Sequence, residues 1–280
     1  MKIYALINTQ SGSVPHNAED ALSAQLKNLG KDAEILAVTG AELENALEKI
    51  MQASPDLLIV WGGDGTHAMS LKTTSSLKIP VMPLPGGTMN LLPKRVYGDD
   101  CQWKDCLATL AHPHEIVSLS AGRIEEHFFY IAANVGPLSE LSAARECIRE
   151  GEIVEAVKSL IESDVGNFEE GFTLRNKNLD FVTKANAFGV FVPKSAGDLF
   201  QVISVDPDNF IDAAATGITA WVNGVRDAVG THVHSLKKGS FKSEDGNPIS
   251  ANIDGELVEL PSGFEFDLQR DAGFVMRRSK

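Results

Sequence analysis

One short segment combines the residue types that hold phosphate in proteins. Gly62-Gly63-Asp64-Gly65-Thr66 directly follows an apolar run, Leu57-Leu58-Ile59-Val60-Trp61. Its glycines allow positive φ values and let backbone amides approach an anion without obstruction by side chains. Residues 67–74 can start a helix, whose N-terminus favours negative charge. Asp64 would repel phosphate directly, so we interpret it as holding a cation or a cation-bound water against the phosphates.

The loop matches neither of the two commonest phosphate-binding motifs. The chain has no Gly-x-x-x-x-Gly-Lys-Ser/Thr, and residues 62–66 do not fit Gly-x-Gly-x-x-Gly. Glycine-rich turns between a strand and a helix also occur for packing reasons alone. The acid in the middle of this one favours binding.

Three further segments carry polar groups that could join the site. Asn8-Thr9-Gln10-Ser11-Gly12 follows the strand-like residues 3–7, and Pro85-Gly86-Gly87-Thr88-Met89-Asn90 follows another apolar run. Asp254-Gly255-Glu256 lies late in the chain. Taken alone, Asp254-Gly255 is typical of a hairpin turn between two strands.

The elements around the first three segments alternate between strand and helix. Strands are expected near 2–8, 33–38, 57–61 and 79–84, and the residues between them show helical spacing, as in Leu43, Ala46, Leu47, Ile50 and Met51. The run at 57–61 lacks polar alternation, as in a strand buried on both faces. This pattern predicts an α/β domain over 1–115 with a doubly wound parallel sheet, whose ligands lie at the carboxyl ends of the strands.

After about residue 115 the pattern changes to period 2, as in 185–192 and 264–268. This indicates a mainly antiparallel β domain over 116–269. A helical insert is expected over about 138–163, and another helix over 210–222. The last residues, about 270–280, could pack back on the first domain.

Composition excludes several classes of protein. The chain has 280 residues and a net charge of -13, which argues against binding nucleic acid. It begins without a signal-peptide pattern and has no run long enough to span a bilayer, so we expect a cytoplasmic protein. Its three cysteines lack the spacing of a disulfide framework or a zinc site. The pairs His112/His114 and His232/His234 could ligate zinc, but no cysteine or third histidine lies nearby at ligand spacing, so we interpret them as exposed strand or loop residues.

The four segments, in this order, resemble the catalytic domain of the diacylglycerol kinase family, which includes bacterial lipid kinases and sphingosine and ceramide kinases. The resemblance extends over nearly the whole chain. It implies an α/β domain followed by a β-sandwich with a helical insert, and an ATP site in the cleft between them. The glycine loop is shared with NAD kinases, so the order of all four segments carries the resemblance.

The resemblance also implies roles for individual residues. Asp254 and Glu256 match the acidic pair to which the family assigns the catalytic base and its partner, and Asp64 matches an aspartate of the Mg²⁺ and water network. The segments that match the family's nucleotide contacts comprise Asn8, Thr9, Gln10, Ser11, Gly12, Thr39, Gly62, Gly63, Asp64, Gly65, Thr66, His67, Ala68, Gly87, Thr88 and Asn90.

The chain departs from the family pattern at several positions. Thr9 replaces a usual proline, Met69 a usual glutamate and Leu91 a frequent aspartate. Residues 118–120 contain no equivalent of another metal-linked aspartate, and Gly197-Asp198 alters a customary Asp-Gly pair of a structural Mg²⁺ site. Either the metal is held with fewer carboxylates, which the presence of Asp64, Asp254 and Glu256 favours, or phosphoryl transfer has been lost.

The expected function is therefore an ATP- and Mg²⁺-dependent kinase that phosphorylates the hydroxyl of a lipid such as diacylglycerol or sphingosine. An enzyme of this kind contacts the membrane surface transiently to reach its substrate, and a homodimer is left open. Two alternatives remain: an NAD kinase, and a non-catalytic sensor of nucleotide or lipid on the kinase fold.

Overall fold

The computed structural model describes residues 1–136, 171–176, 181–185, 187–193, 199–205 and 231–279. The chain divides into two compact units: unit 1 comprises Met1–Ala121 and Gln269–Lys280, and unit 2 comprises Gly122–Leu268. The expected helices over 138–163 and 210–222, and the pair Gly197-Asp198, lie outside the described residues.

Unit 1 is built on a parallel sheet whose strands lie in the order β2-β1-β3-β4. After β1 the chain runs to β2 on one side and then returns across β1 to β3, so the direction of winding changes between β1 and β3. Ligands of open α/β sheets bind at such a point, beyond the carboxyl ends of the strands. The strands are β1 (Ile3–Asn8), β2 (Glu34–Val38), β3 (Leu57–Gly62) and β4 (Val81–Pro85).

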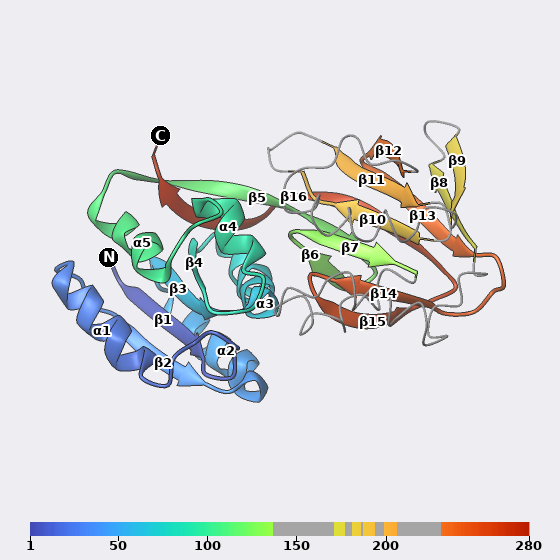
Figure 1. Ribbon diagram of the computed structural model, residues 1–280. Helices are drawn as coiled ribbons and strands as arrows, with labels where there is room; N and C mark the ends of the chain where they lie inside the picture. The colour runs from blue at the N-terminus through green and yellow to red at the C-terminus, as the bar shows by residue number, and fades with distance from the viewer. Residues whose placement is uncertain (137–170, 177–180, 186, 194–198, 206–230, 280) are drawn as a thin grey trace. The chain divides into compact units, whose positions relative to one another are not determined.

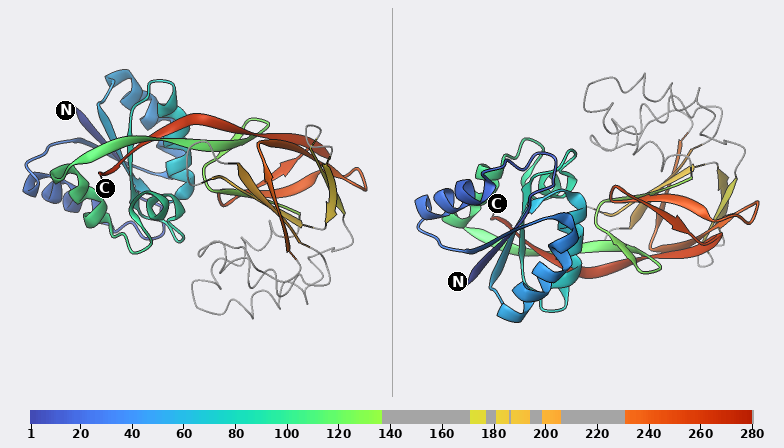
Figure 2. Two further views of the ribbon diagram at one scale, coloured as in Figure 1. Left: turned by 90° about the horizontal axis from the view of Figure 1, so that it is seen from above. Right: turned by 90° about the horizontal axis from the view of Figure 1, so that it is seen from below.

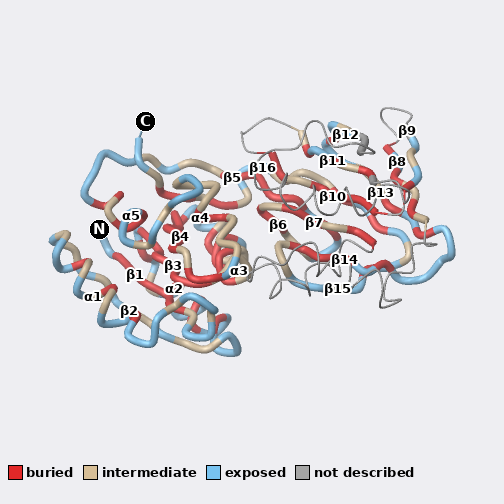
Figure 3. The backbone as a smooth tube through the Cα atoms, viewed as in Figure 1, coloured by how far each residue is buried: buried red, intermediate tan, exposed pale blue. Residues whose placement is uncertain are grey.

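Helices cover both faces of this sheet (Figures 1 and 2). One face forms an apolar core with α1 and α5, and α2 and α3 pack on the other. All six residues of β3 are buried for this reason (Figure 3), as its unbroken apolar run predicts. The helices of unit 1 are α1 (Ala18–Asn28), η1 (Gly40–Glu42), α2 (Leu43–Ala53), α3 (Asp64–Ser75), α4 (Leu91–Tyr97), α5 (Trp103–Leu107) and η2 (Ala108–Ala111).

Two prolines lie at the carboxyl end of β4. Leu58 N–H of β3 donates to Pro80 O at 3.0 Å. The backbone N–H and C=O groups of alternate residues from Pro80 onward therefore point toward β3, and the backbone groups of Pro83 and Pro85 point to the opposite side of β4. A proline has no N–H, so this edge presents fewer donors that need a partner.

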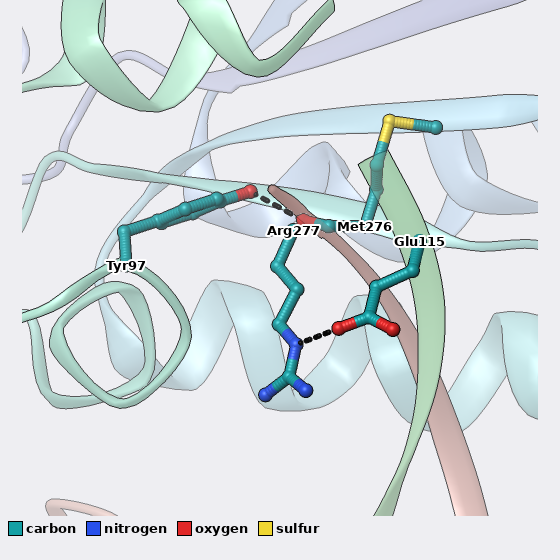
Figure 4. A network of polar contacts seen from close by, with 4 residues as sticks. All are labelled: Tyr97, Glu115, Met276 and Arg277. Carbon is teal, nitrogen blue, oxygen red and sulfur yellow. Dashed lines mark hydrogen bonds and ion pairs between the residues drawn. The ribbon is translucent and has the colours of Figure 1, made fainter. Parts of the chain in front are cut away.

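The last strand contributes to unit 1 through its C-terminal part. β16 (Gly263–Arg278) pairs in parallel with β4, Val275 opposite Val81. Tyr97 Oη donates to Met276 O at 2.9 Å, and Arg277 Nε bonds Glu115 Oε1 at 2.8 Å (Figure 4). Burial raises the pKa of the Tyr97 phenol, which therefore stays a neutral donor. These bonds fix the end of the chain to unit 1.

Unit 2 is a sandwich of two mainly antiparallel sheets. One contains the last residues of β5 (His114–Ile124), the first part of β16, and the strands β6 (His127–Phe129), β8 (Phe172–Asn176), β9 (Phe181–Ala185) and β13 (Lys238–Ser243). The other contains β7 (Ala132–Val135), β10 (Ala187–Phe191), β11 (Phe200–Val205), β12 (Thr231–Leu236), β14 (Ile249–Ile253) and β15 (Glu256–Leu260).

An aromatic core joins the two sheets of unit 2. Phe241 of β13 packs against Phe188 of β10 with ring centroids 5.0 Å apart, and Phe200 of β11 lies 5.6 Å from Phe266 of β16. All four side chains are buried. The predicted fold class, a parallel α/β domain followed by a mainly antiparallel β domain, is thus confirmed.

Candidate functional site

Four loops follow the four parallel strands of unit 1 and meet at one edge of its sheet: residues 9–14, 39–42, 63–66 and 86–90. Parallel strands end at the same edge, so these loops are neighbours although they are far apart in sequence. The hydrogen bonds between them show how closely they are joined.

The first loop is bonded to the glycine loop by two side chains. Asn8 Nδ2 donates to Thr66 Oγ1 at 2.9 Å, and Gly63 N–H donates to Ser11 Oγ at 3.1 Å. Asn8 Oδ1 also accepts from Gln10 N–H at 3.1 Å. The side-chain amide of Asn8 and the hydroxyl of Ser11 therefore hold the two loops together.

The first loop is also bonded to the second. Thr9 Oγ1 donates to Val38 O at 3.0 Å, and Gly40 N–H donates to Gln10 Oε1 at 2.9 Å. Thr39 forms a capping box with Glu42, whose carboxylate accepts from the Thr39 amide at 3.0 Å and from its hydroxyl at 2.7 Å. The hydrogen bond from the Thr39 backbone N–H, and next the one from its hydroxyl, lower the pKa of the Glu42 carboxyl. The Thr39 hydroxyl is thus already engaged as a donor.

The fourth loop is anchored to the first through Ser13. Its hydroxyl donates to Gly87 O at 2.8 Å and its amide to Gly86 O at 2.9 Å. Asn90, in the left-handed region at φ 53°, closes the loop on itself: its side chain accepts from Gly87 N–H at 2.8 Å and donates to Gly87 O at 2.9 Å. The sequence alone did not identify Ser13, although it lies just beyond the segment at 8–12.

Two glycines let the third and fourth loops approach at the backbone level. A Cβ at position 87 would lie 2.8 Å from Gly63 Cα, a contact that backbone atoms cannot relieve without a shift of one loop. Thr88 of the fourth loop also lies near Gly12 of the first loop, since a Cβ at position 12 would lie 3.9 Å from Thr88 Oγ1. The close contact between the loops therefore requires glycine at position 87.

Gly87→Ala is expected to separate these loops and to weaken the ATP binding that the resemblance implies by about tenfold or more, because small displacements of positioning groups have large effects. Calorimetric titration with ATP measures the change. Gly263→Ala serves as the matched control, since a Cβ there meets its nearest atom at an ordinary 3.6 Å. Equal ATP affinity in the two variants would contradict the importance of this approach.

Asp64 links the glycine loop to the start of α4. Its Oδ1 accepts from Leu92 N–H at 3.0 Å, so the carboxylate spans from the first turn of α3 to the first turn of α4. Its second oxygen has no hydrogen bond to any described residue. That oxygen is the one available to a cation or its water. Sequence reasoning did not identify Leu92, because the contact uses only its backbone.

The first turn of α3 presents free donors beside Asp64. The helix begins at Asp64, so the N–H groups of Gly65 and Thr66 precede its first internal acceptor. Within the part of the chain that the structure describes, neither N–H has another acceptor. Free amides at the N-terminus of a twelve-residue helix, next to one free carboxylate oxygen, fit a phosphate chain with a bound cation.

Carboxylates are few at this site. Across the described ranges, no group of three or more His, Cys, Asp or Glu side chains could hold a metal ion. Met69, at the position of a usual glutamate, is 40% exposed on α3, and Leu91 begins α4. A cation held by Asp64 would therefore take most of its ligands from phosphate oxygens and water.

His67 and Ala68 lie in the first two turns of α3. The imidazole of His67 is fully buried, and its Nε2 faces the carbonyl oxygens of Val60 and Leu84. The backbone N–H of His67 donates to Gly63 O at 3.0 Å. In this arrangement the ring faces the sheet, so direct contact with phosphate would require it to leave its position.

Asp254 occupies the turn between β14 and β15 in unit 2. Asp254 and Gly255 both have positive φ, 45° and 102°, so the predicted hairpin turn is confirmed. The Asp254 carboxylate accepts from three successive backbone amides, of Tyr130 at 2.5 Å and of Ile131 and Ala132 at 2.9 Å. This side chain therefore fixes the turn to the segment between β6 and β7, a role additional to any in catalysis.

Three residues near the Asp254 turn differ in their surroundings. Burial, and next the charge of Asp254, raise the pKa of the Tyr130 phenol, which therefore stays protonated at neutral pH. Glu256 is the first residue of β15 and is exposed. Asn252 Oδ1 accepts from Gly255 N–H at 3.0 Å and supports the turn.

Comparison with known proteins gives a family model that matches the first part of the chain and solved structures that share its fold. The sequence model of the diacylglycerol kinase catalytic domain matches residues 2–121. A candidate diacylglycerol kinase from Bacillus anthracis str. Sterne has a TM-score of 0.71 at 17% identity, covering 98% of this chain and 96% of the other. A crystal structure of a diacylglycerol kinase from the same organism gives 0.69 at 14% identity, covering 98% and 96%. At these identities the solved structures establish the shared fold.

Proposed function

We propose that the protein transfers the γ-phosphate of ATP to a lipid hydroxyl in a Mg²⁺-dependent reaction, as the match of residues 2–121 to the diacylglycerol kinase catalytic domain suggests. The observation that carries the proposal is the set of strand-end loops in unit 1. They are joined by side-chain bonds from Asn8, Ser11 and Ser13, and they leave the amides at the start of α3 free.

The loops would act by holding the polyphosphate in one position. Phosphoryl transfer passes through a loose transition state, so positioning and charge compensation contribute more than the strength of a base. The amides of Gly65 and Thr66 would bind phosphate oxygens, and the free oxygen of Asp64 would orient Mg²⁺ or its water. When bound, Mg²⁺ would neutralise negative charge on the phosphate oxygens.

Asp254 would take the proton of the attacking alcohol, with Glu256 as its partner. The lipid oxygen would bond to the γ-phosphorus while the bond from that phosphorus to the bridging oxygen breaks, releasing ADP. The three amides that bond the Asp254 carboxylate would hold it in one orientation. The resemblance of Asp254-Gly255-Glu256 to the family's acidic pair supports this assignment.

The acceptor is proposed to be a lipid at a membrane surface. None of the helices described here is long and apolar enough to cross a bilayer. We propose transient, peripheral contact with the surface that holds the substrate, without a stable anchor.

A panel of acceptors tests the reaction class. The protein is incubated with ATP, Mg²⁺ and, separately, diacylglycerol, monoacylglycerol, a sphingoid base, ceramide or NAD. Phosphate on one of the lipids supports the proposal. Phosphate on NAD alone would replace it with the NAD kinase alternative, which shares the glycine loop.

A non-catalytic nucleotide sensor is a second candidate, because so few carboxylates surround Asp64 in the described residues. Calorimetry with ATP and Mg²⁺ beside the acceptor panel separates the two functions. Tight ATP binding with no phosphorylated product on any acceptor would favour the sensor.

A further inference from the structure

The imidazole of His67 lies at a junction of three elements of unit 1. It projects from the first turn of α3 and is 0% exposed. Its Nε2 lies 3.3 Å from the carbonyl oxygen of Val60 in β3 and 3.1 Å from that of Leu84 in β4. The glycine loop begins just after Val60 and Trp61, and the fourth loop begins just after Leu84 and Pro85.

The surroundings fix the tautomer of the ring. Carbonyl oxygens only accept, so Nε2 must carry the proton and share it between Val60 O and Leu84 O. Nδ1 is buried and has no hydrogen-bond partner among the described residues, which leaves it unprotonated. Burial lowers the pKa of His67, and the nearby Asp64 charge opposes this only in part. The ring is therefore the neutral Nε2–H form.

Two side chains donate to carbonyl oxygens at the end of β4: His67 Nε2 to Leu84 O, and Trp61 Nε1 to Pro85 O at 3.0 Å. Both bonds connect the end of β4 with β3 or α3, the elements that carry the glycine loop.

We propose that His67 is a positioning residue for the nucleotide site: its Nε2–H bonds α3 to the ends of β3 and β4 and so sets the spacing between the glycine loop and residues 86–90. The inference rests on the proposed function for its effect on ATP. It goes beyond that function by assigning the spacing of the loops to a side chain that faces the sheet.

The alternative is that His67 only fills space in a core. Thr74 offers a matched control on the same helix, since it is also 0% exposed and its hydroxyl donates within α3, to Ser70 O at 2.9 Å. Thr74→Val removes a buried hydroxyl whose hydrogen bonds all lie within α3, so no hydrogen bond to β3 or β4 is lost. His67→Leu removes the donor to both strands, whereas His67→Gln keeps an N–H at nearly the same place.

The expected results are measured at a temperature at which every variant is folded. His67→Leu should weaken ATP binding by about tenfold, His67→Gln should restore most of the loss, and Thr74→Val should bind as the wild type does. Amide hydrogen exchange should speed up in both 62–66 and 85–92 for His67→Leu, and in neither loop for Thr74→Val.

Two readouts keep this test separate from the proposed function. If the wild type binds no ATP, the proposed function fails, and hydrogen exchange alone decides the role of His67. In the wild type, ¹⁵N NMR of the ring should show a protonated Nε2 and an unprotonated Nδ1 near neutral pH. A charged ring, or loop exchange in His67→Leu equal to that in Thr74→Val, would overturn the inference.

Discussion

Asp254→Asn is expected to reduce lipid phosphorylation by about 10²–10⁴-fold while ATP affinity changes little, because general-base removal typically costs that much. The residues that we assign to ATP binding lie in unit 1, whereas Asp254 lies in unit 2. Turnover measured with saturating ATP and lipid, beside calorimetry with ATP, gives both quantities for the same preparation.

The structural role of Asp254 requires a control, because asparagine also disturbs its bonds to Tyr130, Ile131 and Ala132. Gly255→Ala provides one: it strains the same turn, where φ is 102°, but keeps the carboxylate. Thermal unfolding shows how far each variant is destabilised. If both variants lose turnover in proportion to their loss of stability, Asp254 supports the fold and is not the base.

Asp64→Asn is expected to weaken ATP binding in the presence of Mg²⁺ but not in its absence. The variant loses a negative charge but keeps an oxygen that can accept from Leu92 N–H, so the start of α4 is preserved. With Mg²⁺, affinity should fall by about tenfold or more, since a paired charge is lost. Without Mg²⁺, affinity should be unchanged or higher, because the repulsion between carboxylate and phosphate is gone.

Paired calorimetric titrations, one with Mg²⁺ and one with a chelator, measure this difference. An equal loss of affinity in both would mean that Asp64 acts through its bond to α4 and not through a cation. Unfolding temperatures close to that of the wild type would confirm that the bond to Leu92 survives in the variant.

The sequence was sufficient for the fold class because the pattern of burial is local. The unbroken apolar run of β3 and the helical spacing of Leu43, Ala46, Leu47 and Ile50 each follow from the surface that the element buries. Asp254-Gly255 indicated its turn for an equally local reason, since both residues suit positive φ.

The contacts of the site could not be read in this way because they join distant segments. Ser13 bonds Gly87 across 74 residues, and Asp254 bonds the amides at 130–132 across more than 120. His67 lies beside the glycine loop in sequence, but only the packing of α3 on β3 and β4 shows that its ring faces the sheet. Periodicity predicts which face of an element is buried, and it does not say which backbone atoms that face will meet.

The most direct test of the account follows the label of ATP into the lipid. The protein is incubated with mixed micelles that contain diacylglycerol, monoacylglycerol, a sphingoid base or ceramide, using ATP labelled at either the γ- or the α-phosphate, with Mg²⁺ or with a chelator. We predict label in the extracted lipid only from γ-labelled ATP and only with Mg²⁺. No label in any of these lipids under conditions in which the protein binds ATP and Mg²⁺ would contradict the proposed kinase function.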